Sequence, residues 1–238
     1  MPHIPLHISA LFISLVFAIA FLILIAVYVS SNRANLPEEE KRNNFISAIV
    51  IIAAWLIFTL IMSVSGFLND YDSMPPHLLL VVLPPLLFFA ILFMAKPFND
   101  LTEQFNVFWL VYAQSFRIIV EFILWLLYRY HIIPEQMTFQ GLNFDVMIGL
   151  TAPFVAYFCF VKKTWSPKVA LVWNFAGLLL LGNIVAVALL STPYPFRVFT
   201  NEPANTLVFS FPFVWLPAFV VPFALLLHLI SIRRLLKV

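Results

Sequence analysis

The chain alternates between long apolar runs and short polar or proline-containing segments. A membrane-spanning helix needs about 20 predominantly apolar residues, and lengths of roughly 17 to 25 are tolerated. The runs in this chain are continuously apolar, whereas strands of a membrane β-barrel would alternate between apolar and polar positions over about 10 residues. Seven runs qualify, at about residues 8–30, 45–67, 78–95, 106–128, 145–161, 169–190 and 208–230. The pattern predicts an all-α membrane protein that forms a seven-transmembrane helix bundle.

Two of the seven runs are shorter than the others. Run 78–95 is interrupted by Pro84 and Pro85, and run 145–161 has Asp145 at its edge. The first run lacks both a basic leading segment and a small-residue cleavage site, so we expect a retained helix rather than a signal peptide. No segment between the runs exceeds about 20 residues, which predicts that residues 1–238 form a single integral membrane domain.

Prolines within the runs predict breaks in the backbone hydrogen bonding. Each removes a backbone donor and leaves the carbonyl four residues earlier without its helical partner. In lipid such a carbonyl must find a donor on a neighbouring helix, a hydroxyl group or water. We expect simple kinks as their commonest effect, and a cavity in the outer half is compatible with the same breaks. The prolines within the runs are Pro84, Pro85, Pro153, Pro212, Pro217 and Pro222.

The composition agrees with a bilayer environment. Charged residues make up 10% of the chain and apolar residues 63%, whereas soluble domains carry about 25% and 45–50%. We therefore predict a multi-pass protein of a cell membrane, either a plasma membrane or a bacterial inner membrane. The net charge of +2 gives no reason to expect nucleic acid as a partner. The single Cys159 cannot form an internal disulfide.

Lys and Arg are distributed unevenly between the two ends of the predicted helices. Short loops rich in these residues stay on the cytoplasmic side. One side carries only Arg129 and Arg197. The other side carries ten basic residues, namely Arg33, Lys41, Arg42, Lys96, Lys162, Lys163, Lys168, Arg233, Arg234 and Lys237. The count predicts an N-terminus outside and a C-terminus in the cytoplasm.

Two charged residues lie deep within the fourth run, where a charge costs at least about 2.5 to 3.5 kcal/mol on insertion scales. Arg117 lies near the midpoint of the run, and Glu121 lies one turn further toward the outside. Their i,i+4 spacing places both on one helical face. Gln114 and Tyr128 extend this face into a polar stripe, which must face other helices or water rather than lipid. We predict a ligand-binding site around the stripe.

Other polar residues are expected at related depths. Asn183 in the sixth run and Asp145 in the fifth fall in the outer half with Glu121, and both are candidate ligand-binding residues. Asn174 lies nine residues before Asn183 and therefore on the opposite face of its helix. For each Asn alone, a hydrogen bond between helices is the commoner role.

Four of the five histidines are expected at the outer ends of the runs. His3 and His7 have a spacing that could chelate a metal on a helix, but Pro2 and Pro5 flank them, and no metal site is predicted. His228, near the inner end of the last run, is expected to be an anchor at the cytoplasmic interface.

The two longest outer segments, at about residues 130–145 and 192–206, mix apolar and aromatic residues with polar ones. The first continues directly from the run that carries Glu121. We expect both segments to pack over the outer mouth of the bundle as partly ordered caps.

Several functions of seven-helix membrane proteins are excluded. The last run has no Lys that could form a Schiff base with retinal, and His228 is single where zinc hydrolases of the ceramidase and adiponectin-receptor type have a His pair. A paired-His haem would need intramembrane histidines on facing helices, and these are missing. The P-loop and Rossmann glycine patterns are also absent. No cofactor is predicted.

Three functions remain open. The first is the binding or transport of a small amphipathic or anionic molecule in an outward-facing intramembrane pocket, in which Arg117 supplies the positive charge and Glu121 orients the ligand or exchanges a proton. The second is a membrane sensor or scaffold that acts through a partner protein, with Arg117 and Glu121 as a neutralising structural pair. The third is an intramembrane enzyme that uses Glu121 as an acid or base. A buried ion pair without an adjoining cavity would favour the scaffold.

Overall fold

Every regular element is helical in the computed structural model, which describes residues 4–237. The predicted all-α class is therefore confirmed, and no strand occurs within these residues. The helices are α1 (Leu6–Arg33), α2 (Glu38–Val64), α3 (Leu79–Met94), α4 (Lys96–Glu103), α5 (Val107–Ala113), α6 (Arg117–Arg129), α7 (Asp145–Ala156), α8 (Pro167–Leu190) and α9 (Val221–Leu235). A 3-10 turn, η2 (Gln114–Phe116), joins α5 to α6, while π-helical stretches extend α7 at its end (η4, Tyr157–Val161) and α9 at its start (η6, Leu216–Val220).

Five helices within residues 4–237 are long and apolar enough to cross a membrane. They are Leu6–Arg33, Glu38–Val64, Val107–Arg129, Pro167–Leu190 and Leu216–Leu235. The two short runs behave differently: α3 forms a sixth span only together with α4, to which it is bent by 83°, and Asp145–Val161 is a shorter apolar helix. The bend follows from Ala95, whose backbone is extended, and from Pro97, which is tolerated in the first turn of α4 because the amide there needs no helical partner.

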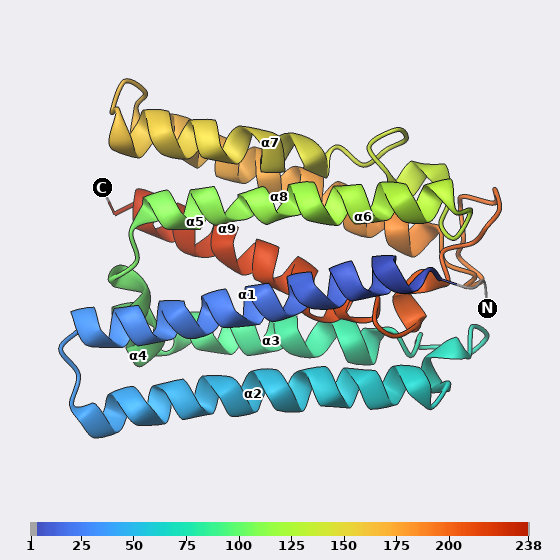
Figure 1. Ribbon diagram of the computed structural model, residues 1–238, viewed down its shortest axis with the longest axis horizontal. Helices are drawn as coiled ribbons and strands as arrows, with labels where there is room; N and C mark the ends of the chain where they lie inside the picture. Colours follow the sequence, from blue (N-terminus) through green and yellow to red (C-terminus); the bar gives the residue numbers. More distant parts are fainter. Residues whose placement is uncertain (1–3, 238) are drawn as a thin grey trace.

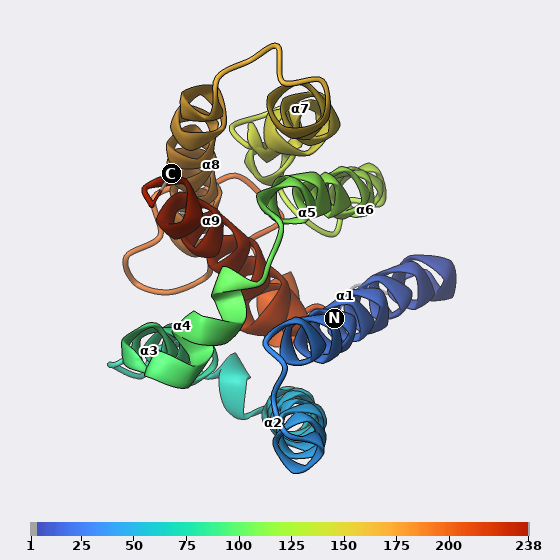
Figure 2. The same ribbon diagram turned by 90° about the vertical axis from the view of Figure 1, so that its left-hand side faces the viewer.

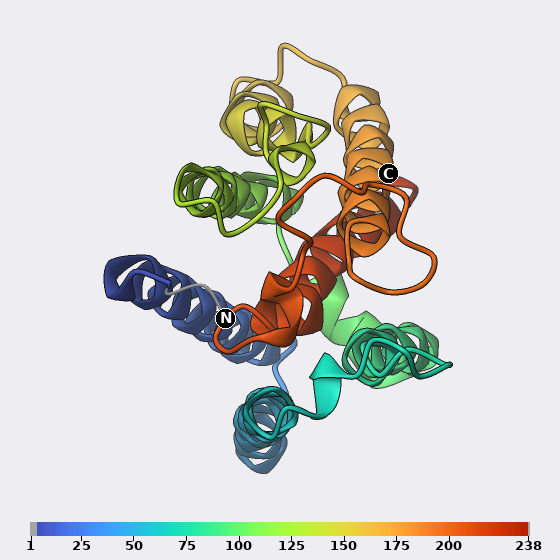
Figure 3. The ribbon, with the colours of Figure 1, turned by 90° about the vertical axis from the view of Figure 1, so that its right-hand side faces the viewer.

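Successive spans run in alternating directions, and the chain termini lie at opposite ends of the bundle (Figure 1). Viewed along the bundle, α9 crosses the centre at a slant, with α5 to α8 on one side and α1 to α3 on the other (Figures 2 and 3). Of the 18 consecutive apolar-rich residues that define each span, 61% are buried inside the protein in Leu216–Leu235, compared with 11% in Glu38–Val64. The last helix is therefore the centre of the core.

This last helix begins later than the sequence predicts. The run at 208–230 was expected to be helical throughout, but residues 207–214 form a 3-10 turn, a bend and further turns. The helix begins at Trp215, and its π-helical stretch begins at Leu216. Pro212 and Pro217 cannot donate helical hydrogen bonds. The irregular backbone is tolerated because Phe209, Phe213 and Val214 are fully buried in protein, where other elements supply partners.

One of these partnerships joins α2 to the last helix. Pro222 has no amide hydrogen to donate to the carbonyl of Ala218, and this carbonyl instead accepts a hydrogen bond of 2.8 Å from Trp55 Nε1 on α2. In return Trp215 Nε1 donates to the carbonyl of Leu56 over 3.1 Å. The expectation that proline-freed carbonyls find donors on neighbouring helices is confirmed at Ala218.

Candidate functional site

Arg117 is the largest fully buried side chain of the described residues and belongs to a polar centre between α6 and α7. Its Nη1 lies 2.6 Å from Oδ1 of Asp145, the first residue of α7. Its Nε donates to Oε1 of Gln114 over 3.1 Å, and Gln114 Nε2 donates to the carbonyl of Ala224 in α9 over 3.1 Å. The guanidinium is thus held from two sides, by an amide and by a carboxylate.

The close packing of α7 on α6 depends on Gly149. A Cβ atom there would lie 2.9 Å from the backbone nitrogen of Ile118 and 3.3 Å from Cβ of Arg117. Only a residue without a side chain permits this approach. The small residue on α7 therefore allows Asp145, one turn earlier, to reach Arg117.

Glu121 is also buried, but it does not pair with Arg117 as the structural reading of the sequence assumed. Its Oε1 accepts a hydrogen bond of 2.7 Å from Nδ2 of Asn143, in the segment before α7. Oδ1 of Asn143 in turn accepts the backbone amide of Asp145 over 3.0 Å. Asn143 therefore joins the Glu121 carboxylate to the backbone of Asp145, and Arg117 forms its ion pair with Asp145 instead of Glu121.

Three polar atoms in this region are buried without a hydrogen-bond partner among the described residues: Arg117 Nη2, Glu121 Oε2 and His228 Nε2. Arg117 interacts electrostatically with both Glu121 and His228. An unpartnered buried polar group costs about 1–3 kcal/mol, and more if it is charged. Such groups at one centre indicate a place where water or a ligand completes the hydrogen bonding.

His228 lies between α8 and α9 rather than at the cytoplasmic interface, where the sequence led us to expect it. The side chain is fully buried, and Nδ1 shares a hydrogen bond of 2.8 Å with Oδ1 of Asn174. Nδ2 of Asn174 donates to Oγ of Ser231 over 2.9 Å. Gly177 leaves room for the imidazole ring, because a Cβ atom there would lie 2.3 Å from Cε1 of His228.

The structure brings together four of the six candidate ligand-binding residues: Gln114, Arg117, Glu121 and Asp145. The other two lie elsewhere. Tyr128 lines a separate pocket of about 370 Å³ at the end of α6, together with Arg129, His131, Glu135 and Gln140. Asn183 donates to the carbonyl of Leu142 over 2.7 Å and so supports the segment before α7 instead of facing Arg117.

Two further residues were not predicted from the sequence: Asn143, which belongs to the polar centre, and His228, which interacts electrostatically with Arg117 from a neighbouring network. Asn143 lies in a segment that was expected to form a cap. Its contact with Glu121 on α6 depends on the fold of this segment, which the sequence pattern does not predict. His228 could have been recognised by its spacing of three from Ser231, which places both on one face of α9.

The two outer segments interlock over this end of the bundle. Thr138 and Asn143 in the first segment and Thr192 and Asn205 in the second are fully buried. Gln136 connects the segments, because its Nε2 donates to Ser191 Oγ and its Oε1 accepts from Asn201 Nδ2.

An ion pair fixes the tip of the second segment. Arg197 Nη1 lies 3.0 Å from Oε1 of Glu202, and this hydrogen bond holds the pKa of the Glu202 carboxyl below its ordinary value. Both outer segments therefore have defined structure above the polar centre.

No group of three or more His, Cys, Asp and Glu side chains within residues 4–237 could hold a metal ion. His3, one of the two histidines whose spacing could chelate a metal, lies outside the described residues. A second pocket, of about 400 Å³, lies at the opposite end of the bundle around Asn106. Neither of these two pockets includes Arg117 or Glu121.

The polar centre lies in the part of the chain that matches a protein family. Residues 74–236 match a family described as a domain of unknown function, DUF8737, and this match covers α3 to α9. Comparisons with curated proteins and with solved structures gave no match. Because the matched residues make up more than half of the chain, the protein belongs to the DUF8737 family.

Proposed function

We propose that this protein is a seven-span transporter or binding protein of a cell membrane, and that its ligand is a small anionic or amphipathic molecule bound between Arg117 and Glu121. The closed arrangement described above is the occluded state of this site. The two outer segments are the gate on the side from which the ligand enters.

The proposed topology is supported by the alternating direction of the spans (Figure 1). The basic residues counted above fall at the cytoplasmic ends of helices in this arrangement: the end of α1, the starts of α2, α4 and α8, the link from α7 to α8, and the end of α9. The bent α3 and α4 and the short α7 then count as spans, and the N-terminus is outside.

The observation that carries the proposed function is the free Nη2 of Arg117. Arg117 is 2% exposed, and only one edge of its guanidinium is used by Asp145. A guanidinium presents paired donors that match a carboxylate or phosphate. Nη2 and the free Oε2 of Glu121 could hold an anion between them, provided that Glu121 is protonated and donates.

Charge balance requires that proton. With Asp145 and Glu121 both ionised, two negative charges face the single positive charge of Arg117, and an anion would be repelled. Protonation of Glu121 as the anion enters keeps the net charge of the centre unchanged. At alkaline pH, where Glu121 is ionised in the free protein, binding should therefore take up one proton per anion, and this coupling is the basis of symport.

The proposal is tested by ligand-induced stabilisation of the purified protein in neutral detergent. Suitable probes are acetate, benzoate, octanoate, glycerol 3-phosphate and inorganic phosphate. We expect at least one to raise the unfolding temperature, because ligand at 100 times its Kd stabilises by about 2.7 kcal/mol. Arg117→Gln should abolish the response. The matched control Arg197→Gln, in the outer segment, should retain it.

A second candidate is a membrane scaffold, and the buried pair of Arg117 and Asp145 away from both described pockets favours it. In that case the polar centre only ties α6, α7 and the outer segment together. Unfolding of both Arg117→Gln and Glu121→Gln, with no probe stabilising the wild type, would support the scaffold and overturn transport.

A further inference from the structure

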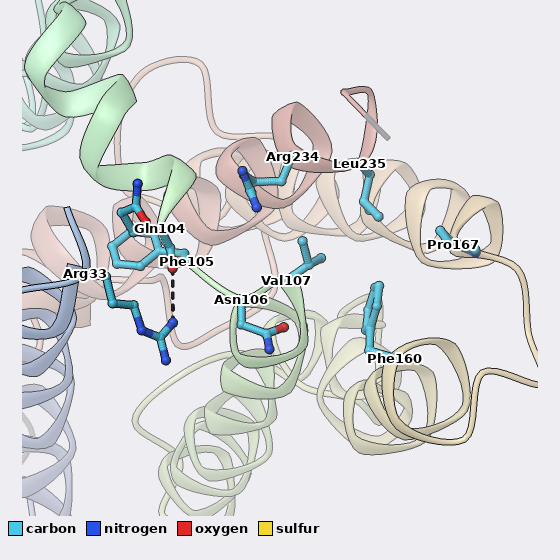
Figure 4. Close-up of a pocket in the computed structure, with 9 residues that line it drawn as sticks. All are labelled: Arg33, Gln104, Phe105, Asn106, Val107, Phe160, Pro167, Arg234 and Leu235. Carbon is cyan, nitrogen blue, oxygen red and sulfur yellow. Dashed lines mark hydrogen bonds between the residues drawn. The ribbon is translucent and has the colours of Figure 1, made fainter.

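A pocket of about 400 Å³ opens at the basic end of the bundle, around the start of α5 (Figure 4). Its lining comes from five parts of the chain: the end of α1, the link from α4 to α5, η4, the start of α8 and the end of α9. A volume of this size lies within the range of small-ligand sites, about 300–1,000 Å³. No contact in the polar centre around Arg117 involves this pocket.

Two arginines give the pocket its charge. Arg33 Nη1 donates to the carbonyl of Gln104 over 3.1 Å, a contact that holds this side chain at the pocket wall (Figure 4). Arg234 contributes a buried Nε with no hydrogen-bond partner among the described residues. The unpartnered donor shows that the protein does not satisfy the polar lining by itself.

Neighbouring charges leave these two arginines available. Arg233 donates to Oδ1 of Asn99, and Lys237 forms an ion pair with Glu103. Glu103 also interacts electrostatically with Arg234, but it is exposed and is not part of the pocket lining. Arg233, Arg234 and Lys237 therefore outnumber the Glu103 carboxylate with which they interact, and Arg33 adds a further positive charge at the pocket wall.

The rest of the lining is mainly apolar: Phe105, Val107, Phe160, Pro167 and Leu235. An arginine pair above an apolar floor fits a molecule with a negatively charged phosphate and a hydrocarbon part. The pocket is at the level where the apolar helices end and the basic residues gather, which is the level of lipid head groups. Basic pockets between membrane helices on the cytoplasmic side bind anionic head groups.

We propose that this pocket binds the phosphate head group of an anionic phospholipid, with Arg33 and Arg234 as its phosphate ligands and the apolar floor as the seat of its glycerol and upper acyl carbons. A free phosphate offers the same charge without the hydrocarbon part. The proposal does not depend on the transport function, since it concerns a different site.

Thermal unfolding in neutral detergent tests the proposal, with phosphatidylglycerol, phosphatidylcholine of the same acyl chains, and inorganic phosphate added separately. We expect stabilisation by phosphatidylglycerol alone. Arg33→Gln/Arg234→Gln should raise the half-saturating concentration about 30-fold, from about 1 kcal/mol per basic residue. The control Lys41→Gln/Arg42→Gln removes the same charge at the same end of the bundle but outside the pocket. It should change the half-saturating concentration of phosphatidylglycerol less than threefold.

A second variant covers the case in which the double arginine variant does not fold. Val107→Trp fills the pocket without changing the charge, and should weaken the phosphatidylglycerol response about tenfold. Three results would overturn the proposal: an unchanged response in the variants that affect the pocket, an equal loss in the control, or equal stabilisation by inorganic phosphate.

Discussion

Arg117 and Asp145 form a buried ion pair of 2.6 Å, although 28 residues separate them along the chain. One comes from the middle of a long span and the other from the first turn of a short helix. The pair fixes the first turn of α7 against α6, and the neighbouring Asn143 brings Glu121 into the same network. Removal of either charge should therefore destabilise this region, because the other charge would stay buried without its partner.

The first prediction concerns this pair. Arg117→Gln leaves Asp145 buried without a counter-charge, and breaking a buried pair in this way costs about 3–5 kcal/mol. Asp145→Asn should be destabilising for the same reason. The double variant removes both charges and should be more stable than either single variant in thermal unfolding experiments. If its destabilisation equals the sum of the two single effects, the two residues are not coupled.

The second prediction concerns the close contact between Gly177 and His228. Gly177→Ala places a methyl group against the imidazole ring and should lower stability by about 1–3 kcal/mol. In a His228→Ala background the same substitution should have little effect, because the ring is gone. Gly182→Ala on the same helix is the control, since a Cβ atom there meets nothing within 4 Å. Equal effects at positions 177 and 182 would contradict the packing described for His228.

The third prediction concerns the hydrogen bond from Trp55 to the carbonyl of Ala218. Trp55→Phe should destabilise by about 1–3 kcal/mol, because the carbonyl freed by Pro222 loses its donor. Pro222→Ala restores a helical donor, so Trp55→Phe should cost less in that background. Chemical or thermal unfolding of the four proteins measures this coupling. The proline has no part in the contact if the cost is the same in both backgrounds.

The fourth prediction concerns the direction of the chain across the membrane. In a Cys159→Ser background, a membrane-impermeant maleimide should label Thr200→Cys in intact cells. Glu39→Cys, in the first turn of α2, should be labelled only after permeabilisation. Labelling of both sites in intact cells, or of Glu39→Cys alone, would reject the proposed orientation.

The helical elements could be predicted from the sequence because apolar length is a local property. Two runs do not form long spanning helices by themselves, namely 78–95 and 145–161. They are also the two shortest apolar runs in the sequence. The predicted start of the last helix was wrong because residues 207–215 are as apolar as a span, but most of them are buried in protein and lie largely before the regular helix. Hydropathy alone does not distinguish burial in protein from burial in lipid.

The polar centre was predictable only in part. The cost of an intramembrane charge identified Arg117 and Glu121, and helical spacing added Gln114. The partner of Arg117 could not be read from spacing, because Asp145 and Asn143 reach the centre through the fold of the segment before α7. Tyr128 shares the predicted stripe, yet it lies about two turns beyond Glu121. It lines a separate pocket, to which Glu135 and Gln140 of the same segment also contribute.

The central claim is that an anion binds between Arg117 and Glu121 together with a proton. Titration calorimetry with the most strongly stabilising probe, in two buffers of different protonation enthalpy, measures this proton directly. At alkaline pH, the wild type and the control Glu202→Gln should take up one proton per bound anion, and Glu121→Gln should bind with no uptake. Binding without proton uptake by the wild type, or equal uptake by Glu121→Gln, would contradict the account.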